Sequence, residues 1–265
     1  MRSWLFVPGD RPERFDKAVA SGADMVVLDL EDAVRAEAKD AARETIAGWL
    51  TQGSRVAVRI NGIGTRWHAD DVALLQSPGI VAVLLPKAEQ AEALKSFAAA
   101  LPDSVVIVPL IETALGIWNA RELAAAPGVA RMAFGSVDFQ LDCGMDGNPQ
   151  SLLYARSRLV LTSAIARIAP PVDGVTLRLD DIKQLRSDVA AARSLGFGGK
   201  LCIHPSQVAH VNAGFQPDAD ALARARKIVD AAMTSGRGAF RLDGQLIDEP
   251  VIEQAKRILA WANRS

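Results

Sequence analysis

Two acidic residues of this 265-residue chain closely follow short apolar runs, where the ends of strands would place them. Glu112 follows the run 105–111, and Asp138 follows the run 131–134 within the letters FGSVD. If the two runs are neighbouring strands, their ends lie about 5 Å apart, so both carboxylates could bind one ion. Two hard oxygen ligands with open positions suit Mg²⁺, and the carboxylate and keto oxygens of a 2-oxo acid would complete its shell. From position alone, the alternative of two solvated loop carboxylates remains open.

Arg59 lies at the end of another apolar run and is the predicted partner of a substrate carboxylate. Its planar guanidinium matches two carboxylate oxygens at once. A salt bridge from Arg59 to Asp29 or Glu31 is the alternative, and both interactions could hold together. Alternation along a strand places Asp29 and Glu31 on one side. With Asp32, they are expected to orient Arg59 or to hold metal-bound water.

Basic residues also open the first predicted helix, beside Pro8-Gly9. They are Arg11, Arg14 and Lys17. A helix N-terminus with cations nearby can bind phosphate. A solvated basic face is the alternative reading of the same residues.

Eight short apolar runs recur along the chain, and their starts are separated by about 20 to 45 residues. Most are continuously apolar, which is typical of parallel strands covered by helices. Helical segments are predicted between them, over 11–20, 36–50, 88–101, 114–126, 151–168 and 181–195. The pattern therefore predicts an α/β fold, a (β/α)₈ TIM barrel with its chemistry at the carboxyl ends of the strands. A doubly wound sheet is less favoured, because no G-x-G-x-x-G follows any run. The runs are 4–7, 25–30, 56–60, 80–85, 105–111, 131–134, 174–177 and 200–203.

The last fifth of the chain lies beyond this pattern. Residues 217–233 and 249–261 are predicted to be helices, and residues 238–244 a short hairpin or turn. We therefore expect a TIM-barrel catalytic domain over 1–214 and a C-terminal helical lid extension over 215–265. The extension could fold over its own barrel or over that of a neighbouring subunit.

The composition excludes several classes of protein. Thirty basic and 31 acidic residues leave a net charge of −1, which argues against a nucleic-acid partner. Two cysteines exclude a disulfide framework. No apolar run approaches the ~18 residues of a membrane span, and the first run is too short for a signal peptide. We expect no membrane partner and a cytoplasmic location.

Nine motifs, in order, identify a family resemblance that covers essentially the whole chain. The chain resembles the citrate lyase β-subunit-like proteins of the HpcH/HpaI aldolase group, within the phosphoenolpyruvate/pyruvate barrels. The motifs are RSWLFVPGDRPERFDKA, GADMVVLDLEDAV, KDAAR, VRIN, LLPKAE, PLIETALGI, FGSVDF, LGFGGKLCIHPSQV and DGQLIDEPVIEQA.

The resemblance implies a TIM barrel, Mg²⁺ and Claisen-type cleavage or condensation of a thioester. It implies a substrate such as malyl-CoA, citramalyl-CoA or citryl-CoA, split into a 2-oxo acid and an acyl thioester. Within the matching motifs, Glu112 and Asp138 fall on the metal-binding acids, and Glu112 also meets the substrate. Arg59 falls on the arginine that holds the 2-oxo acid carboxylate.

Three further residues take roles from the resemblance alone. Arg14 and Lys17 lie where the first helix meets the CoA phosphates. Asp248, in the letters LID, falls on the lid aspartate that related lyases place over a neighbouring subunit's site. It is hypothesised to transfer a proton in trans. The likeness also implies a homo-oligomer, a trimer or a multiple of it.

Other functions remain open on the sequence. Citrate lyase β-subunits act on a thioester carried by an acyl carrier protein, whereas stand-alone members use CoA. An HpcH-type pyruvate aldolase would act on free acids, although that branch does not need the LID motif. A subunit of a citrate lyase complex without activity of its own is the third reading.

Overall fold

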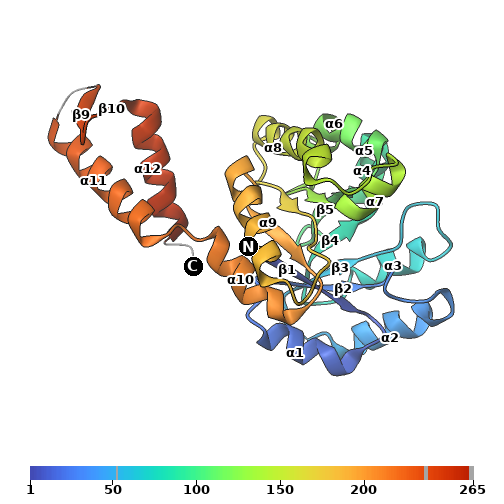
Figure 1. The fold of residues 1–265 in the computed structure, drawn as a ribbon. Helices are drawn as coiled ribbons and strands as arrows, with labels where there is room; N and C mark the ends of the chain where they lie inside the picture. The colour runs from blue at the N-terminus through green and yellow to red at the C-terminus, as the bar shows by residue number, and fades with distance from the viewer. Residues whose placement is uncertain (52, 236–237, 263–265) are drawn as a thin grey trace. The chain divides into compact units, whose positions relative to one another are not determined.

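The computed structural model describes residues 1–51, 53–235 and 238–262 (Figure 1). The chain divides into two compact units, Met1–Asn212 and Ala213–Ser265. Each unit is described below by itself.

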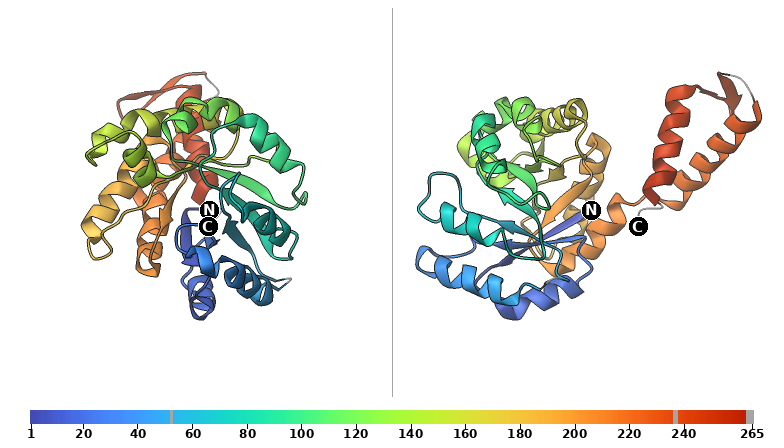
Figure 2. Two further views of the ribbon diagram at one scale, coloured as in Figure 1. Left: turned by 90° about the vertical axis from the view of Figure 1, so that its right-hand side faces the viewer. Right: turned by 180° about the vertical axis from the view of Figure 1, so that it is seen from behind.

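The first unit is a closed barrel of eight parallel strands in sequential order. Pairing of Trp4 with Leu201 joins the last strand to the first and closes the barrel. Figures 1 and 2 show the helices packed around the outside of the strands. The predicted (β/α)₈ barrel is thereby confirmed. The strands are β1 (Ser3–Pro8), β2 (Met25–Asp29), β3 (Val56–Arg59), β4 (Ile80–Leu85), β5 (Val106–Ile111), β6 (Ala133–Phe134), β7 (Val172–Asp173) and β8 (Gly199–Cys202).

The barrel interior is filled by side chains that alternate along the strands. Bulky Trp4, Met25 and Leu84 share this core with the small side chains Ala57 and Ala82. Alternation of large and small residues lets the layers of a narrow barrel interdigitate. The mouth at the carboxyl ends of the strands is therefore the open part of the barrel.

The seventh strand lies at Val172–Asp173, so the expectation of a strand over 174–177 is wrong. Beyond Asp173, side chains rather than a neighbouring strand satisfy the backbone. Lys200 Nζ donates to the Gly174 carbonyl at 2.6 Å, and Gln207 Nε2 donates to the Thr176 carbonyl at 2.9 Å. The apolar residues after Asp173 thus belong to a loop whose carbonyl groups accept hydrogen bonds from side chains.

The outer helices mostly follow the predicted segments but are shorter. Asn119 divides the predicted helix 114–126 into two. Three helices, α3, α7 and α10, lie outside the predicted segments. The elements are η1 (Pro12–Arg14), α1 (Phe15–Ala20), η2 (Ala36–Ala38), α2 (Lys39–Trp49), α3 (His68–Leu74), α4 (Ala91–Ala98), α5 (Ala114–Trp118), α6 (Ala120–Ala124), α7 (Ser136–Asp142), η3 (Pro149–Leu152), α8 (Leu153–Ala166), α9 (Ile182–Leu195) and α10 (Pro205–Phe215).

The second unit contains α11 (Ala219–Ser235), β9 (Phe240–Leu242), β10 (Gln245–Ile247) and α12 (Glu249–Ala262). The two strands pair antiparallel across Asp243-Gly244, both of which have positive φ, as in a type I′ hairpin. Ile228, Ile247 and Ile252 pack into a small core of their own. Among the described helices of either unit, none is long and apolar enough to cross a membrane.

Candidate active site

A cavity of about 380 Å³ lies at the mouth of the barrel, where the strands end. Five residues singled out in the sequence line it: Asp29, Asp32, Arg59, Glu112 and Asp138. They reach the cavity from the ends of β2, β3 and β5 and from the first turn of α7. Parallel strands bring residues distant in sequence to one edge of the barrel, which explains the convergence.

Glu112 follows β5 and is only 2% exposed. Its Oε1 accepts a hydrogen bond of 2.8 Å from the backbone nitrogen of Lys87, which adopts a left-handed φ of 49°. Burial, the charge of Glu31 and the charge of Asp138 together raise the pKa of Glu112 to about 8. The site therefore disfavours the charged form of this carboxyl, first through burial and then through the neighbouring acids.

Gly135, directly after β6, makes room for Glu112. A Cβ at Gly135 would lie 2.4 Å from the Cβ of Glu112 and 2.5 Å from its Oε2. Such a contact is too close for any side chain. The glycine is thus required because β6 passes directly against the acid that ends β5.

Asp138 is half-buried in the first turn of α7 and lines the same cavity as Glu112. Its charge is one of the causes that raise the pKa of Glu112, so the two carboxylates interact electrostatically. A divalent cation between them would relieve this repulsion, and carboxylate oxygens are the ligands that Mg²⁺ prefers. Over the described ranges no group of three His, Cys, Asp or Glu could hold a metal. An ion here would therefore take its remaining ligands from water or substrate.

Arg59 is held by three carboxylates. Its Nε and Nη2 donate to the two oxygens of Asp29 at 2.7 and 2.6 Å. Nη1 lies 2.9 Å from Glu31 Oε2 and 3.3 Å from Asp32 Oδ2. The guanidinium also lies over the ring of Phe6, 4.8 Å from its centre. The salt bridge to Asp29 and Glu31 that the sequence left open is therefore present, and it fixes the orientation of Arg59 in the cavity wall.

Glu31 has a larger part in the site than the sequence indicated. Burial raises the pKa of its carboxyl to about 7, against the opposing effect of the nearby Arg59. Its Oε2 is buried and pairs with Arg59 without a well-aligned hydrogen bond. After burial, the Glu31 charge is the largest cause that raises the pKa of Glu112. In the sequence, the indication of this role was the position of Glu31, two residues after Asp29 and on the same side of the strand.

Arg14 and Lys17 do not line the cavity. Both are exposed and lie after β1, Arg14 in η1 and Lys17 in α1. Lys17 is accessible to solvent, and Arg14 makes a loose ion pair of 3.8 Å with Glu13. A negatively charged ligand could therefore reach both side chains.

Asp248 belongs to the second unit and stands directly before α12. Its Oδ1 accepts a hydrogen bond of 3.3 Å from the backbone nitrogen of Val251. Its carbonyl oxygen accepts a second bond of 3.0 Å from Ile252. Asp248 is thus the N-cap of α12, a role that the sequence analysis did not assign.

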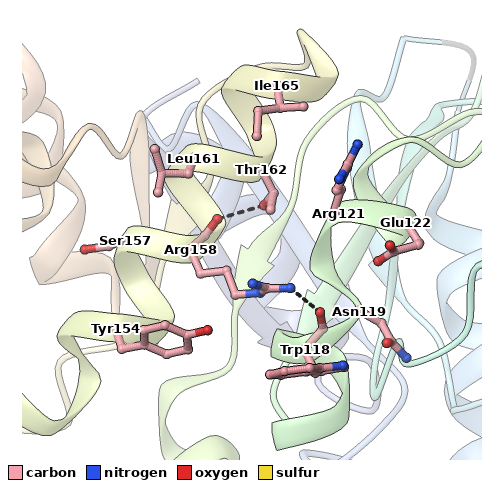
Figure 3. Close-up of a pocket in the computed structure, with 10 residues that line it drawn as sticks. All are labelled: Trp118, Asn119, Arg121, Glu122, Tyr154, Ser157, Arg158, Leu161, Thr162 and Ile165. Carbon is pink, nitrogen blue, oxygen red and sulfur yellow. Dashed lines mark hydrogen bonds between the residues drawn. The ribbon is translucent and has the colours of Figure 1, made fainter.

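A second cavity, of about 460 Å³, lies among the outer helices α5, α6 and α8 (Figure 3). Arg158 of α8 donates to the carbonyls of Ile117, at 2.6 Å, and Trp118. Its guanidinium lies 5.7 Å from the centre of the Trp118 ring. Arg158 thus anchors α8 to the end of α5. Glu122 is the one carboxylate among the lining residues, so the paired acids of the barrel mouth have no counterpart here.

Comparisons with known proteins agree with this geometry. A family model described as HpcH/HpaI aldolase/citrate lyase matches residues 2–205. A citrate lyase subunit beta-like protein of Deinococcus radiodurans is 38% identical over 278 residues, which cover 98% of this chain and 96% of that protein. A (3S)-malyl-CoA thioesterase of Cereibacter sphaeroides is 34% identical over 269 residues, 98% of this chain and 94% of that protein.

Among solved structures, the chain is similar to CitE from Mycobacterium tuberculosis in complex with magnesium, acetoacetate and coenzyme A. The TM-score is 0.88 at 35% sequence identity, and the match covers 99% of this chain and 98% of that one. Both units thus have a counterpart in one related protein. The resemblance expected from the nine motifs is confirmed, and the chain belongs to the HpcH/HpaI aldolase/citrate lyase family.

Proposed function

We propose that this protein is a Mg²⁺-dependent carbon–carbon lyase. It cleaves a 3-hydroxy-3-carboxyacyl thioester of CoA into a 2-oxo acid and an acyl thioester, or it forms the same substrate from them by Claisen-type condensation. The observation that carries the proposal is the shared cavity of Glu112, Asp138 and Arg59 at the barrel mouth. Magnesium and coenzyme A in the related CitE complex support it.

Glu112 and Asp138 are the residues that would hold the ion. When bound, the ion supplies positive charge that stabilises the negative charge developing on a 2-oxo acid. The raised pKa of Glu112 supports this assignment, because burial and the charges of Glu31 and Asp138 outweigh the opposing effects of the Lys87 backbone bond and of Arg59. Lys87 keeps one oxygen of Glu112 in place through its backbone nitrogen.

Arg59 would orient the carboxylate of the 2-oxo acid. Its bonds to Asp29 and Glu31 leave the guanidinium little freedom, so the substrate meets a prearranged donor. Holding reactants in one geometry removes much of the entropic cost of the reaction. Arg14 and Lys17, which are exposed, would meet the phosphates of CoA.

In the cleavage direction, a base removes the proton of the substrate hydroxyl and the carbon–carbon bond then breaks. The resulting thioester enolate takes up a proton. We assign one of these proton transfers to Asp248 from a neighbouring subunit. Its half-buried carboxylate, at the N-terminus of α12, supports a fixed orientation for this role.

The test is a panel of malyl-, citramalyl- and citryl-CoA with Mg²⁺, assayed separately for 2-oxo acid, acyl-CoA and free thiol. A lyase releases 2-oxo acid and acyl-CoA in equal amounts, and Glu112→Gln should abolish both. Free thiol without 2-oxo acid would mean thioester hydrolysis instead. Release of pyruvate from free hydroxy acids, without CoA, would establish the aldolase alternative. No 2-oxo acid from any thioester would overturn the proposal.

A further inference from the structure

Lys39, the first residue of α2, buries its ammonium group behind the active site. The residue is only 5% exposed, whereas lysines are seldom buried without a partner. Its Nζ donates to the carbonyl oxygens of Leu30, at 2.7 Å, and Glu31, at 2.8 Å. The ring of Trp67 lies 5.0 Å from Nζ and covers another side. A charged group is thus used to hold two backbone carbonyls.

These carbonyls belong to the segment that carries the acids of the site. The Leu30 nitrogen donates to the Arg59 carbonyl at 2.9 Å, and the Glu31 nitrogen donates to Asp29 Oδ1 at 2.9 Å. Lys39 therefore completes a set of bonds that holds Leu30 and Glu31 at both their nitrogens and their oxygens. The direction of the Glu31 side chain, toward Arg59, follows from the backbone so fixed.

Lys39 also faces an excess of negative charge. Burial lowers the pKa of Lys39, whereas the nearby charges oppose this effect and favour the charged form; they are those of Asp29, Asp71, Glu31 and Asp32. The ammonium offsets repulsion among these carboxylates without occupying the cavity, because Lys39 is not among the residues that line it. Removing it would leave the Leu30 carbonyl with the Asn61 side-chain amide as its donor, at 3.0 Å, and the Glu31 carbonyl with the Val34 nitrogen, at 3.2 Å. Each carbonyl would thus lose its charged donor, and hydrogen bonds to charged groups are the stronger ones.

We propose that Lys39 is a positioning residue, which fixes Glu31 against Arg59 and so sets the orientation of the arginine toward the substrate carboxylate. The inference rests on the proposed function, because it assumes that Arg59 receives a 2-oxo acid. Loss of a group that orients a metal ligand typically costs 10- to 100-fold in activity, and we expect a loss of the same order for a group that orients Arg59. The expected loss is specific to the 2-oxo acid, because the thioester end of the substrate does not meet Arg59.

The experiment compares the full-length wild type with Lys39→Met in the condensation direction. We expect KM for the 2-oxo acid to rise, and kcat/KM to fall about 10- to 100-fold. KM for the acyl-CoA should stay the same. Lys183→Met, at an exposed lysine of α9, is the matched control and should leave all constants unchanged. If Lys39→Met does not fold, Lys39→Gln replaces it in the comparison, because its side-chain amide keeps a hydrogen-bond donor without the charge.

Two further measurements separate positioning from a general loss of structure. Aminoethylation of Lys39→Cys restores an ammonium group at nearly the same distance and should recover 2-oxo acid affinity, with treated wild type as the control. In a Glu31→Gln background the effect of Lys39→Met should largely vanish, because the two residues act in series.

Pyruvate binding, followed without turnover, distinguishes the failure of this inference from that of the proposed function. The inference alone is overturned if the wild type binds pyruvate and turns over a thioester, and Lys39→Met has the same kinetic constants as the wild type. Equal losses in both KM values without rescue by aminoethylation also overturn it. A wild type that neither binds pyruvate nor turns over any thioester overturns the proposed function, and the inference with it.

Discussion

The Glu112 carboxyl is buried beside two other acids, and this makes its charge sensitive to pH and to cations. All three residues, Glu112, Asp138 and Glu31, follow apolar runs of the sequence, and the pairing of Glu31 with Arg59 was one of its two expectations for that arginine. The burial of Glu31 and its repulsion of Glu112 were not predictable, since they depend on how the strand ends meet in the folded barrel. The sequence therefore indicates which acids reach the mouth, and the tertiary structure decides which of them repel.

Stability should depend on pH through Glu112. Folding raises its pKa from an ordinary value of 4.5 to about 8, so the folded protein binds more protons than the unfolded chain in this window. In the absence of metal, the free energy of unfolding must then fall as pH rises from 4.5 to about 8. Glu31 acts in the same direction up to about pH 7. Because protons compete with Mg²⁺, the rise in Tm on adding Mg²⁺ should grow between about pH 6 and pH 8.

Thermal melts with and without Mg²⁺ across this range check the prediction. Glu112→Gln is the control and should lose most of both effects. A Tm gain that is independent of pH in the wild type would contradict the assignment of Glu112.

Asp248 has a structural and a proposed chemical role, and two substitutions separate them. Asn caps a helix about as well as Asp, whereas Ala costs about 1 kcal/mol. Asp248→Asn should therefore preserve the stability of α12 while lowering kcat as much as Asp248→Ala does, with little change in KM. Steady-state kinetics beside thermal melts check this. Wild-type kcat in Asp248→Asn would refute the proton-transfer role.

At the scale of elements, the contact between β5 and β6 determines where Glu112 can lie. Gly135→Ala would place a methyl group 2.4 Å from the Glu112 Cβ, so one of the two segments must move. We expect a loss of about 1–3 kcal/mol of stability and most of the activity.

Gly48→Ala in α2 is the matched control for this change. A Cβ there meets nothing within 4 Å, and the substitution should stabilise the helix by about 0.5–1 kcal/mol. Denaturant unfolding and turnover of both variants check the pair. Full activity in Gly135→Ala would show that Glu112 tolerates displacement and does not need its observed position.

Strands that are continuous apolar runs were predictable as elements, because burial on both faces leaves a clear pattern. The position of β7 was not. Its ladder contains the charged Asp173, which is buried with two cations beside it: Arg156 donates to it at 3.1 and 2.5 Å, and Lys200 Nζ lies 4.0 Å from it. The short helix α7 was also missed, since its seven residues, about two turns, are too few to display a helical period.

At the scale of the whole molecule, α5 and α8 carry an apolar surface. Trp118, Tyr154, Leu161 and Ile165 are 62–69% exposed and lie around one groove (Figure 3). Aromatic residues with arginine are typical of protein interfaces. We therefore predict that a second copy of this chain covers this surface in the expected homo-oligomer.

Light scattering after gel filtration tests this prediction. The wild type should have the mass of an oligomer, and the double substitution Leu161→Asp with Ile165→Asp should lower it. Val19→Asp, at an exposed apolar residue of α1, should not. A wild-type monomer, or an unchanged mass in the double variant, would contradict it.

The most direct test of the central claim is a titration of the full-length protein with Mn²⁺, a spectroscopic substitute for Mg²⁺, followed by electron paramagnetic resonance. If Glu112 and Asp138 hold one ion at the barrel mouth, the wild type binds one Mn²⁺ per chain. Glu112→Gln and Asp138→Asn should each lose that binding while keeping the fold. Mn²⁺ binding at wild-type strength in both variants, or none in the wild type, would contradict the account.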